Sequence, residues 1–307
     1  MPSSDYYSSI DKAEMSVVDN NLVQANKHYK KSLFNCKGCF ASDYFSAFKV
    51  AWEIRDLEFA NYNASKLIEK GMPLHFFEQY ELIKNDTQRW DELISMANKN
   101  RFINNKYRRE LELMFDDDQC ERSIKSHDRS HIAIVDSINF IKFKNLVTNN
   151  GFPSESSIGI ESTINNTGIK PSPFRILLLH FSQRQFMGID SLLSELLKNN
   201  IIKPEEYVTY KPFLNSKEFD YYSFPIISMN DTLFTYKLDD SRVAKVNKLR
   251  KNIGLYSIGN QIQKMQYNID TPERKFRISP FFSVQILPNF PQSVKDSLLK
   301  PLAEWRK

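Results

Sequence analysis

Two helical hairpins in the first hundred residues carry small residues at nearly the same spacing. Residues 8–19 and 21–34 have apolar side chains at helical spacing, and so do the stretches that begin at Ser42 and Asp56. Matched positions lie 34 or 35 residues apart: Ala13 with Ala47, Ala25 with Ala60, and Leu33 with Ile68. Alanine lets the helices of a hairpin approach closely, and a period near 34 is typical of tetratricopeptide (TPR) repeats. We therefore expect TPR-like hairpins, although the Trp-Leu-Gly stretch and the proline of the full repeat are absent. The alternative is chance similarity between two amphipathic hairpins.

Further helices are predicted along most of the chain, and its 8 glycines are too few for a fold rich in β-hairpins. The expected helices cover 75–86, 86–100, 104–127, 131–151, 173–185, 189–202 and 239–252. Short strands are expected within 207–216, 221–229 and 232–238, where β-branched and aromatic residues alternate with turn residues. The predicted fold class is mainly α: TPR-like helical hairpins followed by a mostly helical domain with a few short strands.

Three regions follow from this pattern. Residues 1–100 form the helical repeat region, and residues 101–256 form a helical domain with a polar pocket. Residues 257–307 form a C-terminal extension, in which the sequence does not order the elements.

Charge and hydropathy indicate which partners to expect. The 42 Lys and Arg residues are scattered among 37 Asp and Glu residues, for a net charge of +5. Because a duplex-binding protein usually gathers its positive charge on one face, we expect no nucleic-acid partner. No run approaches the roughly 18 apolar residues that span a bilayer, so no membrane partner is expected. The first residues, MPSSDYYSSIDKAEM, do not read as a secretion signal. The expected location is cytoplasmic, or extracytoplasmic if a signal peptide has been removed.

Two short cysteine and histidine patterns have spacings that occur in metal sites. Cys36 and Cys39 form a C-x-x-C pair after a helical stretch, whereas zinc sites usually need four Cys or His ligands. His127 and His131 have metal-competent spacing and need a third ligand such as His180 or Asp136. The Glu of an H-E-x-x-H motif is missing, so a solvated helix end is favoured. We expect plain loop cysteines, no metal and no cofactor.

A polar set could instead carry chemistry in the second region. Asp118 and Arg122 lie four residues apart, on one face of a helix. His180 follows four apolar residues in FRILLLHFSQRQFMG, and a carboxylate such as Asp118 or Asp136 could fix its tautomer for acid–base work. No nucleophile elbow or phosphate-binding glycine loop accompanies it. The alternative is a core histidine that has found a hydrogen-bond partner.

The order of these motifs resembles an uncharacterised bacterial domain family that follows helical repeats in Bacteroidota-type proteins. Its motifs are Asp-Gln-x-x-Arg, Asp-x-x-Asn, Gly-Trp-Pro with a later Gly, Gln-His, Tyr-x-x-Leu-x-Asp-Arg, Gly-Thr-Gln and Arg-x-x-x-Gly-Leu. The matching residues are Asp118, Gln119, Arg122, Asp136, Asn139, Gly151, Phe152 (for Trp), Pro153, Gly159, His180, Arg250, Gly254 and Leu255. The resemblance implies fold and element order, and it adds Gln119 and Asn139 as ligand-binding candidates.

The departures from the family pattern bear on function. Leu179 replaces the Gln before His180, Asn215 and Ser216 stand where Asp-Arg is expected, and no Gly-Thr-Gln precedes Asp239. Because the polar set is incomplete, the favoured function is a non-enzymatic interaction module that binds a protein or peptide on the repeat surface. The alternative is a hydrolase-like small-molecule enzyme or ligand-binding domain. It would use His180, Asp118, Arg122 and Asp136, and would require these side chains to converge.

Overall fold

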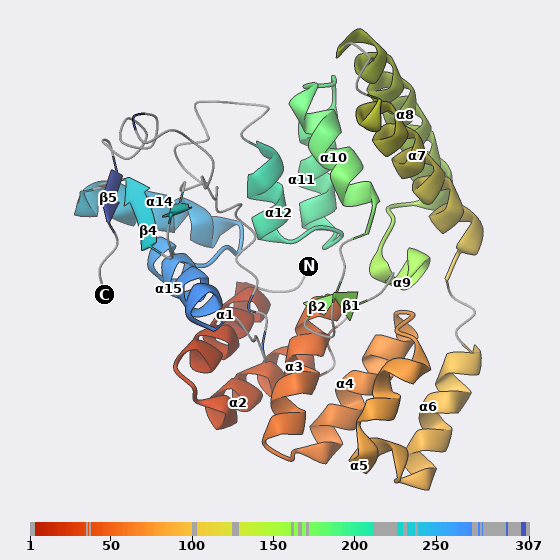
Figure 1. Ribbon diagram of the computed structural model, residues 1–307, viewed down its shortest axis with the longest axis vertical. Coiled ribbons are helices and arrows are strands. Elements are labelled where there is room, and N and C mark those ends of the chain that lie inside the picture. Colours follow the sequence, from red (N-terminus) through yellow and green to blue (C-terminus); the bar gives the residue numbers. More distant parts are fainter. Residues whose placement is uncertain are drawn as a thin grey trace.

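The computed structural model describes most of the chain as helices (Figure 1). The described residues are 4–34, 36, 38–99, 103–124, 129–160, 163–164, 168–169, 172–211, 226–229, 232–236, 239–271, 276, 278, 293 and 302–304. The predicted mainly α fold of helical hairpins is confirmed. None of the described helices combines the length and apolar character that crossing a membrane requires.

Stacked hairpins form the N-terminal part of the molecule. In chain order its elements are α1 (Ser4–Val18), α2 (Leu22–Leu33), α3 (Ala41–Glu53), α4 (Leu57–Glu69), the 3₁₀ helix η1 (Leu74–Gln79), α5 (Glu81–Lys84) and α6 (Thr87–Lys99). α1 packs on α2, α3 packs on α4, and neighbouring hairpins meet through α2 with α3 and α4 with α6. The matched alanines 13, 25, 47 and 60 are all fully buried. Their small side chains therefore set the close helix spacing that the sequence pattern predicts.

Polar side chains cap the beginnings of two of these helices, α2 and α4. Asn21 caps α2 by accepting a hydrogen bond from the Gln24 amide, and Asp56 caps α4 by accepting one from the Phe59 amide. Gly71, with φ of +95°, follows the C-cap of α4. A Cβ at Gly71 would lie 2.8 Å from Ile103 Cδ1, so this turn also requires glycine for space.

A second hydrophobic core is built from α7 (Asn105–Ser123), α8 (Arg129–Asn150), α9 (Glu155–Ile158), α10 (Phe174–Gln183), α11 (Ile189–Lys198) and α12 (Pro204–Tyr210). The rings of Phe143, Phe174 and Phe181 are fully buried at its centre and pack on one another. α10 contributes Leu177, Leu178 and Phe181 to this core, which leaves its opposite face for polar residues. The residues of the first core lie between Tyr6 and Leu93, with Ile160 and Ile278 as the two exceptions. Those of the second core begin at Tyr107.

The C-terminal part returns to the beginning of the chain. α14 (Asp240–Asn252) is followed by α15 (Ile258–Asp270), and α15 packs on α1 (Figure 1). The strands are short: β1 (Thr163–Ile164) pairs with β2 (Gly168–Ile169), and β4 (Thr232–Tyr236) pairs with β3 (Ile226–Met229) and β5 (Leu302–Glu304), all antiparallel. Two of the three predicted strands are thus present, as β3 and β4.

Three expectations about local structure are corrected. Residues 207–210 are helical rather than extended, because Pro204 begins α12 and the Glu206 side chain accepts from the Lys203 amide at 2.7 Å. The expected helix over 75–86 is divided into η1 and α5 at Tyr80, where the buried rings of Phe76, Phe77 and Tyr80 crowd together. Part of the C-terminal extension is a regular helix, α15, whose buried face includes Ile258, Ile262 and Met265.

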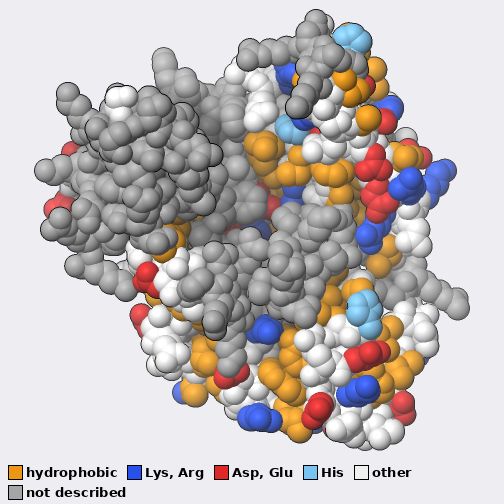
Figure 2. All heavy atoms as spheres, in the orientation of Figure 1, with side chains coloured by type: hydrophobic (Ala, Val, Ile, Leu, Met, Phe, Trp, Pro, Cys, Tyr) orange, Lys and Arg blue, Asp and Glu red, His pale blue; other side chains and the backbone are white. Residues whose placement is uncertain are grey.

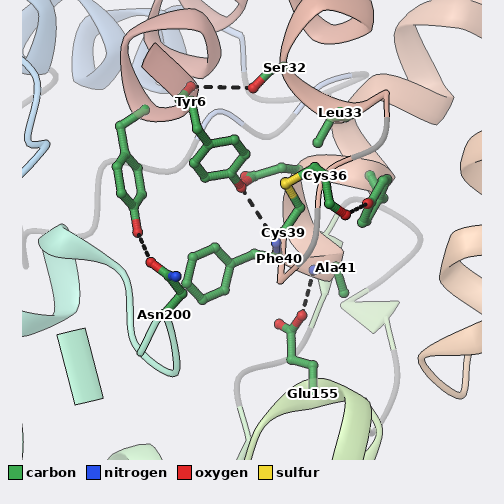
Figure 3. The surroundings of a disulfide bond; sticks show 12 residues. Tyr6, Ser32, Leu33, Cys36, Cys39, Phe40, Ala41, Glu155 and Asn200 are labelled. Carbon is green, nitrogen blue, oxygen red and sulfur yellow. Dashed lines mark hydrogen bonds between the residues drawn. A yellow bond between two sulfur atoms is a disulfide. The ribbon is translucent and has the colours of Figure 1, made fainter. Parts of the chain in front are cut away.

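The C-x-x-C pair lies in the loop between α2 and α3, as predicted. The two cysteines are not the plain loop cysteines that we expected, because their sulfurs form a disulfide (Figure 3). Cys39 is buried beside Phe40, whereas Cys36 is partly exposed. The third cysteine, Cys120, is an exposed free thiol on α7.

Charges on the surface follow the mixed pattern of the sequence. On the described part of the face in Figure 2, Lys and Arg side chains are interspersed with Asp and Glu side chains. Charges of both signs are therefore spread over the described part of this face, which agrees with the scattered charges of the chain.

Candidate functional site

The four side chains predicted to carry chemistry meet where α7, α8 and α10 pack together, and we call them and Arg184 the His180 cluster. Asp118 comes from α7, Asp136 from α8 and His180 from α10. The two carboxylates are buried, with side-chain exposures of 1% and 0%. The convergence that the enzyme or ligand-binding alternative requires is therefore present.

Arg122 joins the two buried carboxylates. Its Nη1 lies 2.5 Å from Asp118 Oδ1, one helical turn away, and its Nη2 lies 2.8 Å from Asp136 Oδ1. Arg184, which the sequence analysis did not select, donates from Nε to Asp136 Oδ2 at 2.7 Å. Its position four residues after His180, at the C-cap of α10, is the sequence signal that could have identified it.

His180 makes one side-chain hydrogen bond. Its Nδ1 lies 2.9 Å from Asp118 Oδ1, and within the described part of the chain Nε2 has no hydrogen-bond partner. When Nδ1 donates to the ionised carboxylate, Nε2 carries the lone pair and can accept a proton. Burial opposes ionisation of Asp118, but the bonds from His180 and Gln119 and the charge of Arg122 outweigh it and hold its pKa below the ordinary 3.8.

The two proposed ligand-binding side chains have different surroundings. Gln119 is exposed, and its Nε2 donates to Asp118 Oδ2 at 2.7 Å, so it completes the shell of that carboxylate. Asn139 is buried and donates to the Met114 carbonyl at 3.0 Å. It therefore links α8 to the backbone of α7 within the helix interface.

The same residues include a set of side chains that resembles a metal site. One ligand atom each of Asp118, Asp136 and His180 lie within 4.8 Å of one another. Two guanidinium groups already bond these carboxylates, and a cation placed there would be repelled by both. The charge balance therefore favours no metal ion. Of the other candidate pair, His127 lies outside the described residues and His131 is exposed on α8.

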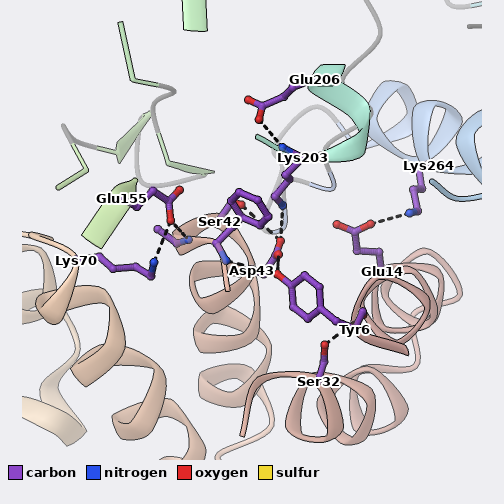
Figure 4. Close-up of polar contacts among 12 residues, drawn as sticks. Tyr6, Glu14, Ser32, Ser42, Asp43, Lys70, Glu155, Lys203, Glu206 and Lys264 are labelled. Carbon is purple, nitrogen blue, oxygen red and sulfur yellow. Dashed lines mark hydrogen bonds and ion pairs between the residues drawn. The ribbon is translucent and has the colours of Figure 1, made fainter. Parts of the chain in front are cut away.

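A second polar group, which sequence reasoning missed, lies between the hairpins and the C-terminal helices (Figure 4). We call it the interdomain charged cluster; it comprises Asp11, Glu14, Asp43, Lys70, Glu155, Arg175, Lys203, Glu205, Glu206 and Lys264. Lys203 Nζ lies 2.5 Å from Asp43 Oδ1, and the Tyr6 hydroxyl donates to the same carboxylate. These partners are far apart in sequence, so no local spacing marks them.

Lys264 is the most deeply buried cation of this second cluster. It is 0% exposed and lies 2.7 Å from Asp11 Oδ1 and 2.6 Å from Glu14 Oε2, so it ties α15 to α1. Burial lowers the pKa of Lys264, but the two neighbouring carboxylates outweigh it and raise the pKa above 10.5.

Glu155, like Lys264, is a charged residue of this cluster that connects two parts of the chain. Its Oε2 accepts from the Ala41 amide at 2.6 Å and pairs with Lys70 at 3.2 Å (Figures 3 and 4). Burial opposes ionisation of Glu155, and the charges of Lys70 and Arg175 more than compensate, so its pKa is lowered. Glu155 thereby fixes the start of α3 against the second core.

No family model, curated protein or solved structure matches the chain. The resemblance to the bacterial domain family therefore stays a prediction, and the functional argument depends on the geometry of the two clusters.

Proposed function

We propose that this chain binds a small anionic molecule at the His180 cluster and that His180 transfers a proton there. One observation carries the proposal: His180 Nδ1 is bonded to a buried carboxylate, while its Nε2 has no partner among the described residues. A carboxylate that fixes the imidazole tautomer in this way leaves the second nitrogen ready to act as a general base. This is the small-molecule, hydrolase-like alternative that the sequence analysis raised.

The anionic character of the ligand is inferred from Arg184. Among the described residues only its Nε is bonded, to Asp136, and its side chain is 33% exposed, compared with 12% for His180. The terminal nitrogens of Arg184, four residues after His180, therefore remain available as donors within the described structure, and such donors favour a carboxylate or phosphate group. Arg122, in contrast, uses both of its terminal nitrogens on the two buried carboxylates.

An NMR titration tests this proposal. Inorganic phosphate and acetate are added to the full chain while the histidine ring resonances are followed, with the His180 signal assigned from His180→Gln. We expect the His180 ring to shift saturably, and Arg184→Gln to weaken the effect about tenfold. His75 is exposed on η1, and His75→Gln is the matched control. Failure of both anions to shift His180, or an equal response in Arg184→Gln, would refute anion binding.

A second candidate is the protein-interaction module that the sequence analysis favoured, and the stacking of the hairpins supports it. α1 and α3 are packed against α15 and β2 of the same chain, so a partner would use other surfaces of the array. Val23 is 58% exposed at the beginning of α2, which makes that helix the first to test. A partner protein captured by the wild type and lost with Val23→Asp would support the module. Capture that is unchanged by Val23→Asp would exclude this surface.

The disulfide bears on the location we propose. Such bonds form in oxidising compartments and are rare in the cytosol, so the Cys36–Cys39 bond supports the extracytoplasmic alternative over the cytoplasmic one. Thiol counting on protein trapped at cell lysis tests this assignment, because a reduced pair would favour the cytoplasm.

A further inference from the structure

A cavity of about 100 Å³ lies inside the interdomain charged cluster, between α1, α3, α12 and the turn after α14. Five carboxylates line it: Asp11, Glu14, Asp43, Glu205 and Glu206. The cationic side chains in the lining are Arg175 and Lys203. Negative charge therefore exceeds positive charge around the space.

Ion pairing does not remove this excess. Lys203 is held by Asp43, Arg175 is held by Glu206, and Lys264, just outside the lining, is shared by two further carboxylates. Arg250, which is also fully buried, adds a fourth positive charge that acts on Glu205 and Asp11. Five carboxylates thus face four cations, so one negative charge is unmatched. Glu205 is the lining carboxylate with no ion-pair partner in the described part of the chain.

Besides Asp11 Oδ1, which is ion-paired with Lys264, two oxygen atoms of the lining have no hydrogen-bond partner within the described structure. They are Glu205 Oε2 and the hydroxyl of Tyr256, a residue that is only 7% exposed. A buried polar atom left unsatisfied costs free energy, and a ligand that supplies donors recovers that cost. Arg175 Nε is also unpartnered, but Arg175 also lines a neighbouring cavity beside Glu155 and Phe174.

We propose that this cavity binds a small organic amine whose ammonium group donates to Glu205 and to the Tyr256 hydroxyl. The negative excess selects a cation, and the apolar side chains of Ile10 and Ile169 in the lining suit a short hydrocarbon chain. A calcium or magnesium ion fits less well, because it needs about six oxygen ligands and most of these carboxylates are already paired.

Calorimetric titration of the full chain with three probes of equal carbon number tests the proposal. Butylammonium carries a positive charge, 1-butanol carries none, and butyrate carries a negative charge that would favour Arg175. We expect saturable binding of butylammonium alone at matched ionic strength. Glu205→Gln and Tyr256→Phe should each weaken it, the first by about tenfold or more. Glu195→Gln, which neutralises an exposed carboxylate on α11, should leave binding unchanged.

Several outcomes overturn this assignment. Butanol binding as strongly as butylammonium would make the cavity merely apolar, and preferential butyrate binding would make it an anion site. Unchanged butylammonium affinity in Glu205→Gln, or in Tyr256→Phe if the first variant does not fold, would place the amine elsewhere. His180→Gln should retain butylammonium binding, so failure here is distinguishable from failure of the proposed anion site.

Discussion

The two polar clusters of this protein differ in how completely their carboxylates are satisfied. In the His180 cluster all four oxygens of Asp118 and Asp136 are bonded, by Arg122, Arg184, His180 and Gln119. In the interdomain charged cluster, carboxylates outnumber cations around a cavity, and Glu205 Oε2 has no partner in the described part of the chain. The first cluster therefore leaves His180 Nε2 available beside fully bonded carboxylates, and the second leaves the Glu205 carboxylate available for a ligand. The charge balance of a buried cluster, more than its residue types, indicates which ligand it can accept.

The largest expected effect comes from removing the buried cation of the interdomain charged cluster. Lys264→Met leaves Asp11 and Glu14 without their shared partner, in a position that is 0% exposed. We expect the free energy of unfolding to fall by about 3–5 kcal/mol, measured by urea denaturation. Lys251→Met changes an exposed lysine on α14 and should cost less than about 0.5 kcal/mol. Equal effects of the two variants would show that the cluster does not hold α15 to α1.

In the His180 cluster, Asp118→Asn should cost about 2–3 kcal/mol near neutral pH, because Arg122 and His180 both lose a charged acceptor. The pKa of Asp118 is lowered in the folded state, so its stabilisation is present above the ordinary value of 3.8 and is lost as pH falls through the folded pKa. The difference between wild type and variant should therefore shrink in acid. Asp117→Asn, at an exposed position, is the control. A gap that stays constant with pH would contradict the pairing.

Arg184→Gln should have a smaller effect on folding than Asp118→Asn. Asp136 keeps its 2.8 Å bond to Arg122, and Arg184 is one-third exposed, so about 1 kcal/mol should be lost. Denaturation of Arg184→Gln beside Arg109→Gln, an arginine that is 62% exposed, measures this loss. A loss as large as that of Asp118→Asn would mean that Arg184 stabilises the packing of the His180 cluster and is not available to bind a ligand.

The last expected effect is about as small as that of Arg184→Gln, but it is a gain in stability, whereas the changes above reduce stability. Burial raises the pKa of Glu205 above the ordinary 4.5, despite the opposing charge of Lys203. An acid whose folded pKa is raised destabilises the fold as pH rises from its unfolded pKa through its folded pKa. Glu205→Gln should therefore be more stable than wild type near neutral pH, by about 1 kcal/mol, and should lose that advantage near pH 4. Denaturation across this range checks the sign, and a variant less stable than wild type at neutral pH would show that Glu205 is paired.

Local sequence patterns predicted most of the helices and one of the two polar clusters, the His180 cluster. Helical periodicity and small residues at a repeated spacing identified the hairpins, since both depend on neighbours one or two helical turns away. The pairing of Asp118 with Arg122 could be predicted for the same reason, because residues four apart share a helix face. Pro204 and the glutamates after it also marked a helix start, although the β-branched and aromatic residues that follow favoured a strand.

The sequence by itself therefore determined a mainly helical chain with hairpins, capped helix ends and a polar turn on α7. Only the tertiary structure decided that His180 meets Asp118, 62 residues away, and that Lys264 is buried against Asp11 and Glu14 at the other end of the chain. The physical reason is that periodicity reports which face of a helix is buried, whereas an ion pair depends on which two faces pack together. That choice is made by the shapes of both cores at once, and no local spacing records it.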